Sequence, residues 1–427
     1  MDILELIVHH LPLVSTRWLT TAIGGLCRNE QFRGYLSRRE TALMRQTGQI
    51  QKILVLSDIN IGDAINIQSC IEVLRLHCPD AQIDYLYNRV ADPLIRGNPE
   101  ISHTLPVFRG FLRPSRLDRE SLRDLLKKQP YDLIINFCPF LTKGDFDGAG
   151  CPVVFPLGLL AGIIGARTGG VSRASLVYNI KAYMHQRMNG LPGKDNSKPE
   201  TSASSGVQIH LGRGALEKRD QYISTLHVSP DDRIVFFNPD TSNPYTFINE
   251  ELQVDLLKEL LSDRHLDFVF LGSGIVFKDI EKELYHQVPR DLRKKLVVAK
   301  SLPIDVYASL LDLCDVFITG DTGPMHIAAA RKVCIDGDPS FKNRTAMVSL
   351  FGATDSQIYG YDSVREGYIG ANQDAPSRVF DASPSCRNIS CSIQRVTRTC
   401  SRGRCFEGLE IGDVAAYVKE YLSSLEK

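Results

Sequence analysis

The chain has 427 residues, with 50 Lys plus Arg against 50 Asp plus Glu and 11 cysteines. This length exceeds one ordinary domain and predicts two lobes of roughly 150–200 residues each. The balanced charge excludes a global field that would attract nucleic acid, and the odd, scattered cysteine count is typical of a reduced cytoplasmic protein rather than a small disulfide scaffold.

The first 50 residues are predicted to form a helical extension, because apolar residues recur at spacings of three and four. The apolar stretch 3–14 lacks a basic lead-in and is therefore not a secretory signal, and no run reaches the ~18 apolar residues of a membrane helix. The extension has a basic edge, formed by Arg17, Arg28, Arg33, Arg38, Arg39 and Arg45. We favour a helix pair packed on the first lobe or on another subunit, with peripheral contact to the inner membrane as the alternative.

From residue 52, short apolar runs alternate with helical stretches, which predicts βαβ units and mostly parallel sheets. The first lobe, 51–225, has predicted strands at 53–56, 83–87 and 131–136 and predicted helices at 64–77 and 115–127. Its stretch 191–206 is rich in Pro, Gly, Ser and Lys and is predicted to be a loop or linker.

The second lobe, 226–385, repeats the alternation more regularly. Its predicted strands are 233–237, 267–271, 296–299, 316–319 and 346–351, and its predicted helices are 249–262, 276–285, 304–313 and 324–332. Segment 386–427 is rich in Cys and Arg. Because ligands bind at the carboxyl ends of strands in such sheets, functional residues are expected directly after the strands.

The turn after the strand at 316–319 is the strongest local feature of the sequence. Gly323 and Pro324 begin an Ala-rich helix, whose free N–H groups and positive dipole end suit a diphosphate. Thr322 could add a hydroxyl to a phosphate oxygen, and Asp321 could accept from sugar or ribose hydroxyls. On spacing alone, ordinary helix capping by Asp321 and Thr322 is an equal alternative, and His326 has a capping or packing role rather than a catalytic one.

A second turn follows the first strand, where Gly62 allows an unusual backbone angle and Asp63 opens the next helix. A carboxylate at this edge could act as a general base toward a hydroxyl acceptor, although an N-cap is the commoner role of such an aspartate. The helix N-terminus is expected to lower the pKa of Asp63.

Four cysteines near the C-terminus could bind zinc or iron, although their spacing is not a repeated C-x2-C pair. They are Cys386, Cys391, Cys400 and Cys405. Free thiols or a disulfide pair are the alternatives. The arginines among them form a local basic patch that could hold an anionic acceptor.

Three segments together resemble glycosyltransferase family 9, the ADP-heptose lipopolysaccharide heptosyltransferases. They are the strand and turn at 53–63 continuing through 78–84 to 97–99, the D-T-G-P-M-H-x-A-A-A motif within 320–330, and V-S-L-F-G-A-T-D at 348–355. The resemblance implies a GT-B fold, with two Rossmann-like lobes facing across a cleft, and inverting transfer without an essential catalytic metal. It also implies that the helix at 411–424 packs back toward the first lobe.

By this resemblance, Asp63 deprotonates the acceptor hydroxyl and a set of second-lobe residues binds the donor. The donor set is Asp321, Thr322, Gly323, Pro324, Met325 and His326, with Thr241, Ser242 and Gly272. The sequence departs from the family pattern in three places. Loop 238–247 has no Lys or Arg to steady the leaving phosphate, the acidic residue expected after 271–274 is displaced, and 334–344 is a polar insertion.

The sequence therefore predicts a glycosyltransferase that moves a sugar from a nucleotide sugar such as ADP-heptose to a hydroxyl, with heptose as the favoured sugar. The acceptor is lipopolysaccharide, another glycan, or protein hydroxyls as for some iron-containing relatives with a cysteine cluster, and the enzyme could be an oligomer. The alternative is a non-catalytic sugar-nucleotide-binding protein. A nicotinamide dehydrogenase is disfavoured, because no G-x-G-x-x-G follows either leading strand.

Overall fold

The computed structural model forms two compact units, residues 1–210 and 211–427. It describes residues 26–27, 29–45, 50–57, 60–109, 114–138, 140–160, 176–189, 207–239, 241, 247–272, 284–299, 302–332, 345–362, 376–384 and 404–425. The division falls before helix α10 (Arg213–Thr225), which packs on α13 (Ile304–Leu311) of the second unit. The sequence predicted the boundary after residue 225, which would assign these residues to the first lobe.

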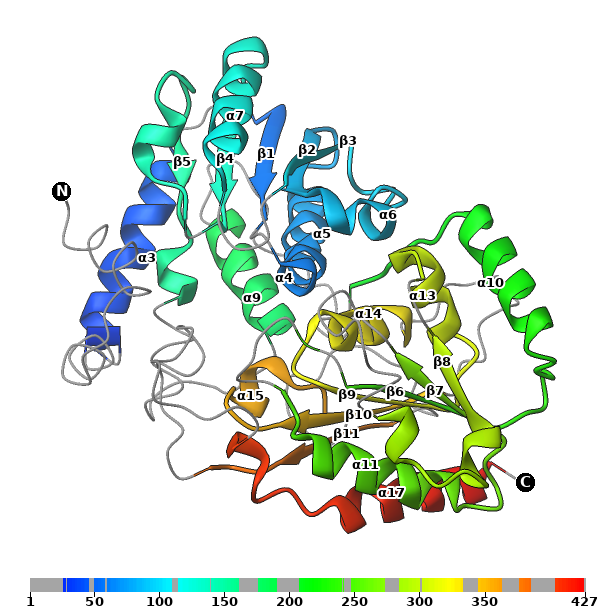
Figure 1. Cartoon of the computed structure of the whole chain (residues 1–427). Helices are drawn as coiled ribbons and strands as arrows, with labels where there is room; N and C mark the ends of the chain where they lie inside the picture. Colours follow the sequence, from blue (N-terminus) through cyan, green and yellow to red (C-terminus); the bar gives the residue numbers. More distant parts are fainter. Residues whose placement is uncertain are drawn as a thin grey trace. The chain divides into compact units, whose positions relative to one another are not determined.

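The first unit contains a parallel five-stranded sheet in the order β3-β2-β1-β4-β5 (Figure 1). Its strands are β1 (Lys52–Leu56), β2 (Gln82–Asn88), β3 (His103–Phe108), β4 (Leu133–Asn136) and β5 (Val153–Val154). Strand β1 lies at the centre, and its residues 53–56 are completely buried. Such short, continuous apolar runs are typical of strands covered on both faces.

Helices cover both faces of this first sheet. The helices are α4 (Ile61–Asn66), α5 (Gln68–His77), α6 (Asp92–Ile95), α7 (Arg116–Lys128) and α9 (Leu176–Asn189), with short 3-10 turns at Arg89–Ala91 and Lys143–Phe146. Leu122 of α7 joins Leu54 and Leu86 in the core on one face. On the other face, the Tyr85 hydroxyl donates to the Ala64 carbonyl of α4 at 2.7 Å, and α5 packs on α9.

The described part of the N-terminal extension, α3 (Glu30–Arg45), packs on the first unit beside β5 and α9 (Figure 1). Its Glu40 is buried and forms an ion pair with Arg187 of α9 at 2.9 Å. The N–H of Gly158 donates to the same carboxylate at 2.7 Å. Residues 1–25, including Arg17, and Arg28 lie outside the described residues.

The second unit contains a parallel six-stranded sheet in the order β11-β10-β9-β6-β7-β8. Its strands are β6 (Ile234–Asn238), β7 (Phe268–Gly272), β8 (Leu296–Ala299), β9 (Val316–Gly320), β10 (Ala346–Phe351) and β11 (Ser377–Asp381). In both sheets the first strand in the sequence lies between the second and the fourth. This is the doubly wound order of dinucleotide-binding folds. The predicted α/β class with two parallel sheets is confirmed.

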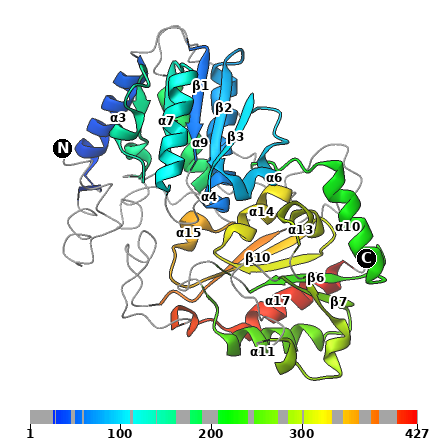
Figure 2. The ribbon, with the colours of Figure 1, turned by 45° about the horizontal axis from the view of Figure 1, so that its top comes forward.

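In the second unit, α11 and α17 cover one face of the sheet, and α13 and α14 cover the other (Figures 1 and 2). The remaining bounds are α11 (Glu250–Leu261), α14 (Gly323–Lys332), α15 (Ser356–Tyr359) and α17 (Ile411–Ser424), with 3-10 turns at Tyr285–Gln287, Leu292–Lys295 and Arg404–Phe406. The helix predicted at 276–285 falls mostly on 273–283, outside the described residues.

The terminal helix α17 belongs to the core of the second unit. Its apolar face, with Val414, Val418 and Leu422, is buried in the cluster that also contains residues of α11. The Lys419 ammonium lies 2.8 Å from the Glu259 carboxylate of α11. The apolar face is thus occupied within this unit, whereas the family resemblance implied packing toward the first lobe.

Candidate functional site

The candidate donor site lies where the second sheet changes direction, between β6 and β9. Asn238 ends β6 and is the register partner of Thr319, the penultimate residue of β9. The chain leaves β6 toward β7 on one side and later leaves β9 toward β10 on the other. In open parallel sheets, ligands bind at the carboxyl ends of the strands that flank this point.

Polar side chains on this face of the sheet are joined at its carboxyl edge. The Tyr307 hydroxyl of α13 donates to Asn238 Oδ1 at 3.0 Å, and Asn238 Nδ2 donates to Thr319 Oγ1 at 3.3 Å. All three residues are buried. Two residues earlier in each strand, the rings of Phe236 and Phe317 pack edge to face instead. Tyr307, Asn238 and Thr319 were not among the predicted site residues, although a polar residue that ends a buried strand, such as Asn238, is a usable signal.

The turn after β9 brings the predicted motif to this row of polar side chains. The hydroxyls of Thr319 and Thr322 lie 3.2 Å apart, and the Met325 N–H donates to the Thr322 carbonyl at 3.0 Å. Residues 321–324 are partly exposed, whereas Met325 is buried. Helix α14 starts at Gly323, so Pro324 occupies its second position and not the first. The positive end of the helix therefore lies at a partly exposed turn, where it can receive an anion.

Gly272 ends β7 beside Asn238. A Cβ at this position would lie 2.9 Å from the Phe236 ring and 3.0 Å from Asn238 Oδ1, which is closer than side chains tolerate. The structure thus places Gly272 directly beside Asn238 at the carboxyl edge of the sheet. Thr241 is also described and is buried, while Ser242 lies outside the described residues.

His326 lies behind the turn and has a packing role. Its Nδ1 lies 2.9 Å from the Tyr361 hydroxyl, and the two rings pack edge to face. Burial lowers the pKa of His326 to about 4, so the imidazole is neutral at neutral pH. A neutral, buried ring fits the packing alternative that the sequence left open. Tyr361 was not predicted.

Helix α14 is fixed to α13 by a buried ion pair. Arg331 donates from Nε and Nη2 to the two carboxylate oxygens of Asp312, at 2.9 and 2.6 Å. Both residues are almost completely buried. A two-point guanidinium–carboxylate contact fixes orientation as well as distance. The N-terminus of α14 is therefore held in a defined position relative to the sheet.

The first unit presents a carboxylate after its own central strand. Asp63 lies in the first turn of α4, and its Oδ2 accepts a hydrogen bond from Asn60 Nδ2 at 3.0 Å. Asn60 occupies the N-cap position, so Asp63 is not the N-cap. Burial raises the pKa of Asp63, and the Asn60 hydrogen bond opposes this only in part. Asp63 is half-buried, and the expectation that the helix N-terminus would lower this pKa is wrong, because the partial burial raises the pKa by more than the local hydrogen bond lowers it.

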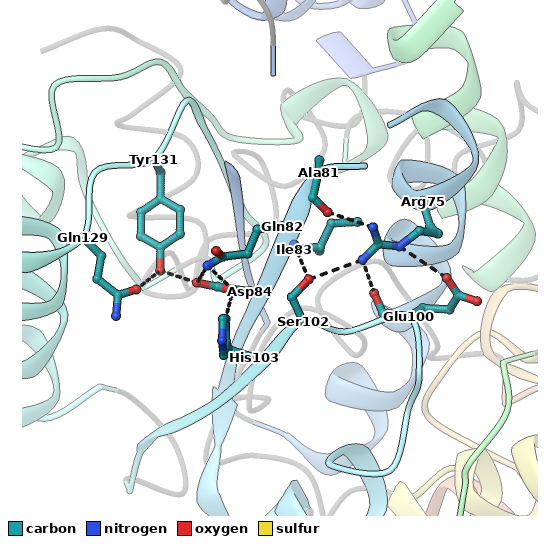
Figure 3. A network of polar contacts seen from close by, with 10 residues as sticks. All are labelled: Arg75, Ala81, Gln82, Ile83, Asp84, Glu100, Ser102, His103, Gln129 and Tyr131. Atoms are coloured by element: carbon teal, nitrogen blue, oxygen red, sulfur yellow. Dashed lines mark hydrogen bonds and ion pairs between the residues drawn. The ribbon is translucent and has the colours of Figure 1, made fainter. Parts of the chain in front are cut away.

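A separate polar network lies at the amino end of β2 and β3 (Figure 3). The buried Asp84 carboxylate accepts from Gln82 Nε2 and from the Tyr131 hydroxyl, each at 2.9 Å, and lies 2.9 Å from His103 Nδ1. In the same view, Arg75 donates to main-chain carbonyls of the neighbouring turns. Since Asp63 follows the carboxyl end of β1, this network is at the opposite edge of the sheet.

The described residues leave the predicted metal site untested. Cys405 is packed against Gly352, where an added Cβ would lie 2.9 Å from Cys405 Cβ. Cys386, Cys391 and Cys400 lie outside the described residues, as does the insertion 334–344. Within the part of the chain that is described, no three His, Cys, Asp or Glu side chains are arranged to hold a metal ion. The cysteine site stays a prediction.

Comparison with known proteins connects this site to one family. Residues 209–383 match glycosyltransferase family 9 (heptosyltransferase). The family 9 glycosyl transferase of Veillonella parvula has 16% identity and a TM-score of 0.64, covering 88% of this chain and 98% of its own. The ADP-heptose lipopolysaccharide heptosyltransferase II of E. coli has 16% identity and a TM-score of 0.55, and the match covers 88% of this chain and 100% of its own. No curated protein sequence matches the chain.

A further solved structure, E. coli heptosyltransferase WaaC with ADP, has 14% identity and a TM-score of 0.52, covering 87% of this chain and 100% of its own. The predicted resemblance to family 9 is thus confirmed, and the fold is that of GT-B-like glycosyltransferases. The matched segment contains the polar row and the α14 turn. None of the helices in the described ranges has the length and apolar character needed to cross a membrane.

Proposed function

We propose that this chain is an inverting glycosyltransferase that transfers a sugar from an ADP-sugar to a hydroxyl group, and that the sugar is heptose. The observation that carries the proposal is the α14 N-terminus at the direction change of the second sheet, inside the segment that matches family 9. Two of the similar solved structures are named for heptose transfer, one of them from ADP-heptose, and one contains ADP.

The donor diphosphate is assigned to the first turn of α14. Gly323 contributes a main-chain N–H and the helix a positive dipole end, and Thr322 supplies a hydroxyl at the same turn, while Pro324 has no N–H and the Met325 N–H donates to the Thr322 carbonyl. Loop 238–247 has no Lys or Arg. The negative charge that develops on the leaving diphosphate is therefore stabilised by oriented dipoles and hydrogen bonds rather than by a cation from that loop.

The general base is assigned to Asp63 of the first unit. The acceptor hydroxyl gives its proton to Oδ1, since Oδ2 already accepts from Asn60. The acceptor oxygen then bonds to the anomeric carbon as the bond to the diphosphate oxygen breaks, and one such displacement inverts the configuration. The raised pKa makes Asp63 a stronger base than an ordinary aspartate, which favours proton removal in the transition state.

A nucleotide panel tests the donor assignment. ADP, GDP and UDP are each added to the full-length protein, and thermal unfolding is measured. ADP at about one hundred times its dissociation constant should stabilise the folded state by about 2.7 kcal/mol. Thr322→Val should reduce this shift, whereas Thr225→Val, a matched change at the exposed end of α10, should not.

Product formation tests the transfer itself. ADP-heptose and heptose-free lipopolysaccharide are incubated with the protein, and a mass increase of one heptose is sought on the acceptor. Stabilisation by ADP without any transfer would leave other glycans and protein hydroxyls as acceptors to be tried. No stabilisation by any of the three nucleotides would contradict the proposed function.

A further inference from the structure

Four side chains form a continuous hydrogen-bonded chain from α13 to the first turn of α14. The order is Tyr307, Asn238, Thr319 and Thr322, and the successive distances are 3.0, 3.3 and 3.2 Å. These residues come from α13, β6, β9 and the turn after β9. The chain therefore crosses the sheet at the point where its winding changes direction, and it ends at the proposed donor site.

The first two bonds have a direction, because an amide oxygen only accepts and an amide nitrogen only donates, whereas either hydroxyl can donate in the third. The Tyr307 hydroxyl donates to Asn238 Oδ1, and the Asn238 amide then donates to Thr319 Oγ1. Thr319 has one hydroxyl proton, and Thr322 Oγ1 lies within reach of it. When Thr319 donates to Thr322, the proton of Thr322 points onward, out of the chain. Each threonine can both accept and donate, so the two hydroxyls can continue the direction set by Tyr307 and Asn238.

The two middle residues of the hydrogen-bonded chain are the most deeply buried, and Thr322 is its most exposed member. Tyr307 is 7% exposed, Asn238 2% and Thr319 0%, whereas Thr322 is partly exposed. Hydrogen bonds in such a low-dielectric interior polarise one another, so a donor at one end strengthens the donor at the other. The outer member, Thr322, is placed beside the positive end of α14.

We propose that Tyr307 and Asn238 are positioning residues, which orient the Thr322 hydroxyl as a hydrogen-bond donor to the diphosphate of the nucleotide sugar. This inference rests on the proposed function. Loop 238–247 contributes no Lys or Arg, so the phosphate needs another partner. A Thr322 hydroxyl that is already held in one orientation donates to the phosphate without the entropy cost of ordering that hydroxyl on binding.

A purely structural role makes a different prediction. If the hydrogen-bonded chain only holds α13 on the sheet, removal of the Tyr307 hydroxyl lowers the stability of the protein and leaves its nucleotide affinity unchanged. If the chain orients Thr322, the same removal weakens nucleotide binding only while Thr322 is present. A double-mutant cycle separates the two roles, because it measures the coupling between residues rather than the loss at either one.

The experiment measures ADP affinity of the full-length protein by calorimetry. Thr322→Val should weaken ADP binding about tenfold or more, as expected for loss of a hydrogen bond to a charged group, and Tyr307→Phe about threefold to tenfold. In the Thr322→Val background, Tyr307→Phe should have no further effect. Thr319→Ser should retain the affinity, because it keeps the hydroxyl, whereas Thr319→Val should lower it.

Tyr131→Phe is the matched control, since it removes a buried tyrosine hydroxyl from the first unit. It should reduce thermal stability and leave ADP affinity unchanged. An equal effect of Tyr307→Phe in both backgrounds, or no effect in either, would overturn the inference alone. A wild-type protein that fails to bind ADP, GDP or UDP would instead contradict the proposed function, and the inference with it.

Discussion

The two units share a winding order but differ in the chemistry at the point where the winding changes direction. In each sheet the first strand lies between the second and the fourth. After β1, the first unit presents Asp63, a carboxylate whose pKa is raised by burial. After β6 and β9, the second unit presents a neutral chain of hydroxyl and amide groups and the N-terminus of α14.

This difference separates the contribution of the fold from that of the loops. The strand order determines where a ligand can reach the carboxyl edge, since the connections on either side of that point diverge. The residues that directly follow the strands determine the chemistry. The first unit offers a proton acceptor and the second offers hydrogen-bond donors. If these two functions are separable, a substitution in one unit should affect only one of them.

Asp63→Asn should produce the largest effect. Loss of a positioned general base lowers turnover by about 10²–10⁴-fold. ADP affinity should stay at the wild-type value, because donor binding is assigned to the other unit. Turnover of ADP-heptose with an acceptor and calorimetric ADP binding are measured on the same preparation.

Asp124→Asn is the matched control for this change, because Asp124 is an exposed aspartate on α7 of the same unit. It should alter neither turnover nor ADP affinity. Wild-type turnover in the Asp63→Asn protein would remove the assigned base. A joint loss of turnover and ADP binding would show that the two units do not divide the functions in this way.

Arg331→Met should have the next largest effect, on stability. It leaves the buried Asp312 carboxylate without its two-point partner, and breaking a buried pair in this manner costs about 3–5 kcal/mol. Because Arg331 fixes α14, ADP affinity should also fall. Chemical unfolding and ADP binding are measured together.

The equivalent change in the first unit is Arg187→Met, which leaves the buried Glu40 unpaired. A similar loss of stability is expected, but with wild-type ADP affinity, since the pair holds α3 on the first unit. If both variants retained full ADP affinity, α14 would not need its ion pair to bind nucleotide. The donor site would then have to be reconsidered.

Local patterns predicted the strands and the turn motif but not the contacts between distant segments. The apolar runs at 316–319 and 346–351 correspond closely to β9 and β10, and Gly323 and Pro324 do begin α14. Tyr307 and Asn238 are 69 positions apart, and Asn238 and Thr319 are 81 apart. No sequence period relates residues so far apart, so the hydrogen bonds between them could be identified only in the folded structure.

The error on Asp63 has the same origin. A helix N-terminus is a local feature, and it correctly argues for a lower pKa. The partial burial of Asp63 in the folded unit is a tertiary effect, and it is larger here. The packing of α17 is also a tertiary effect, because the residues that bury its apolar face come from α11 and other segments of the second unit.

His326→Gln should have a smaller, pH-dependent effect on stability. The pKa of His326 is lowered to about 4 from 6.5. Between these values the unfolded chain binds a proton that the folded chain does not, so wild-type stability falls with decreasing pH by about 1.4 kcal/mol per unit. The variant should lose this part of the slope, as measured by chemical unfolding at pH 5 and pH 7.5.

The sign of this slope distinguishes the two units. A carboxylate with a raised pKa, such as Asp63, takes up its proton in the folded chain first and therefore favours folding as the pH falls. Asp63→Asn should change the slope in the direction opposite to His326→Gln. If His326→Gln had the wild-type slope, His326 would be protonated in the folded protein, and its hydrogen bond with Tyr361 would need another assignment.

Asn60→Ala should have the smallest effect and tests the base directly. The Asn60 hydrogen bond stabilises the ionised form of Asp63, so its removal raises the pKa of that carboxylate further. The base must be ionised to accept a proton, and the acidic limb of the kcat/KM profile should therefore move to higher pH. A shift of about 0.5–1 pH unit corresponds to a hydrogen bond of about 1 kcal/mol. An acidic limb that stays in place while Asp63→Asn abolishes turnover would mean that a group other than Asp63 titrates in that limb.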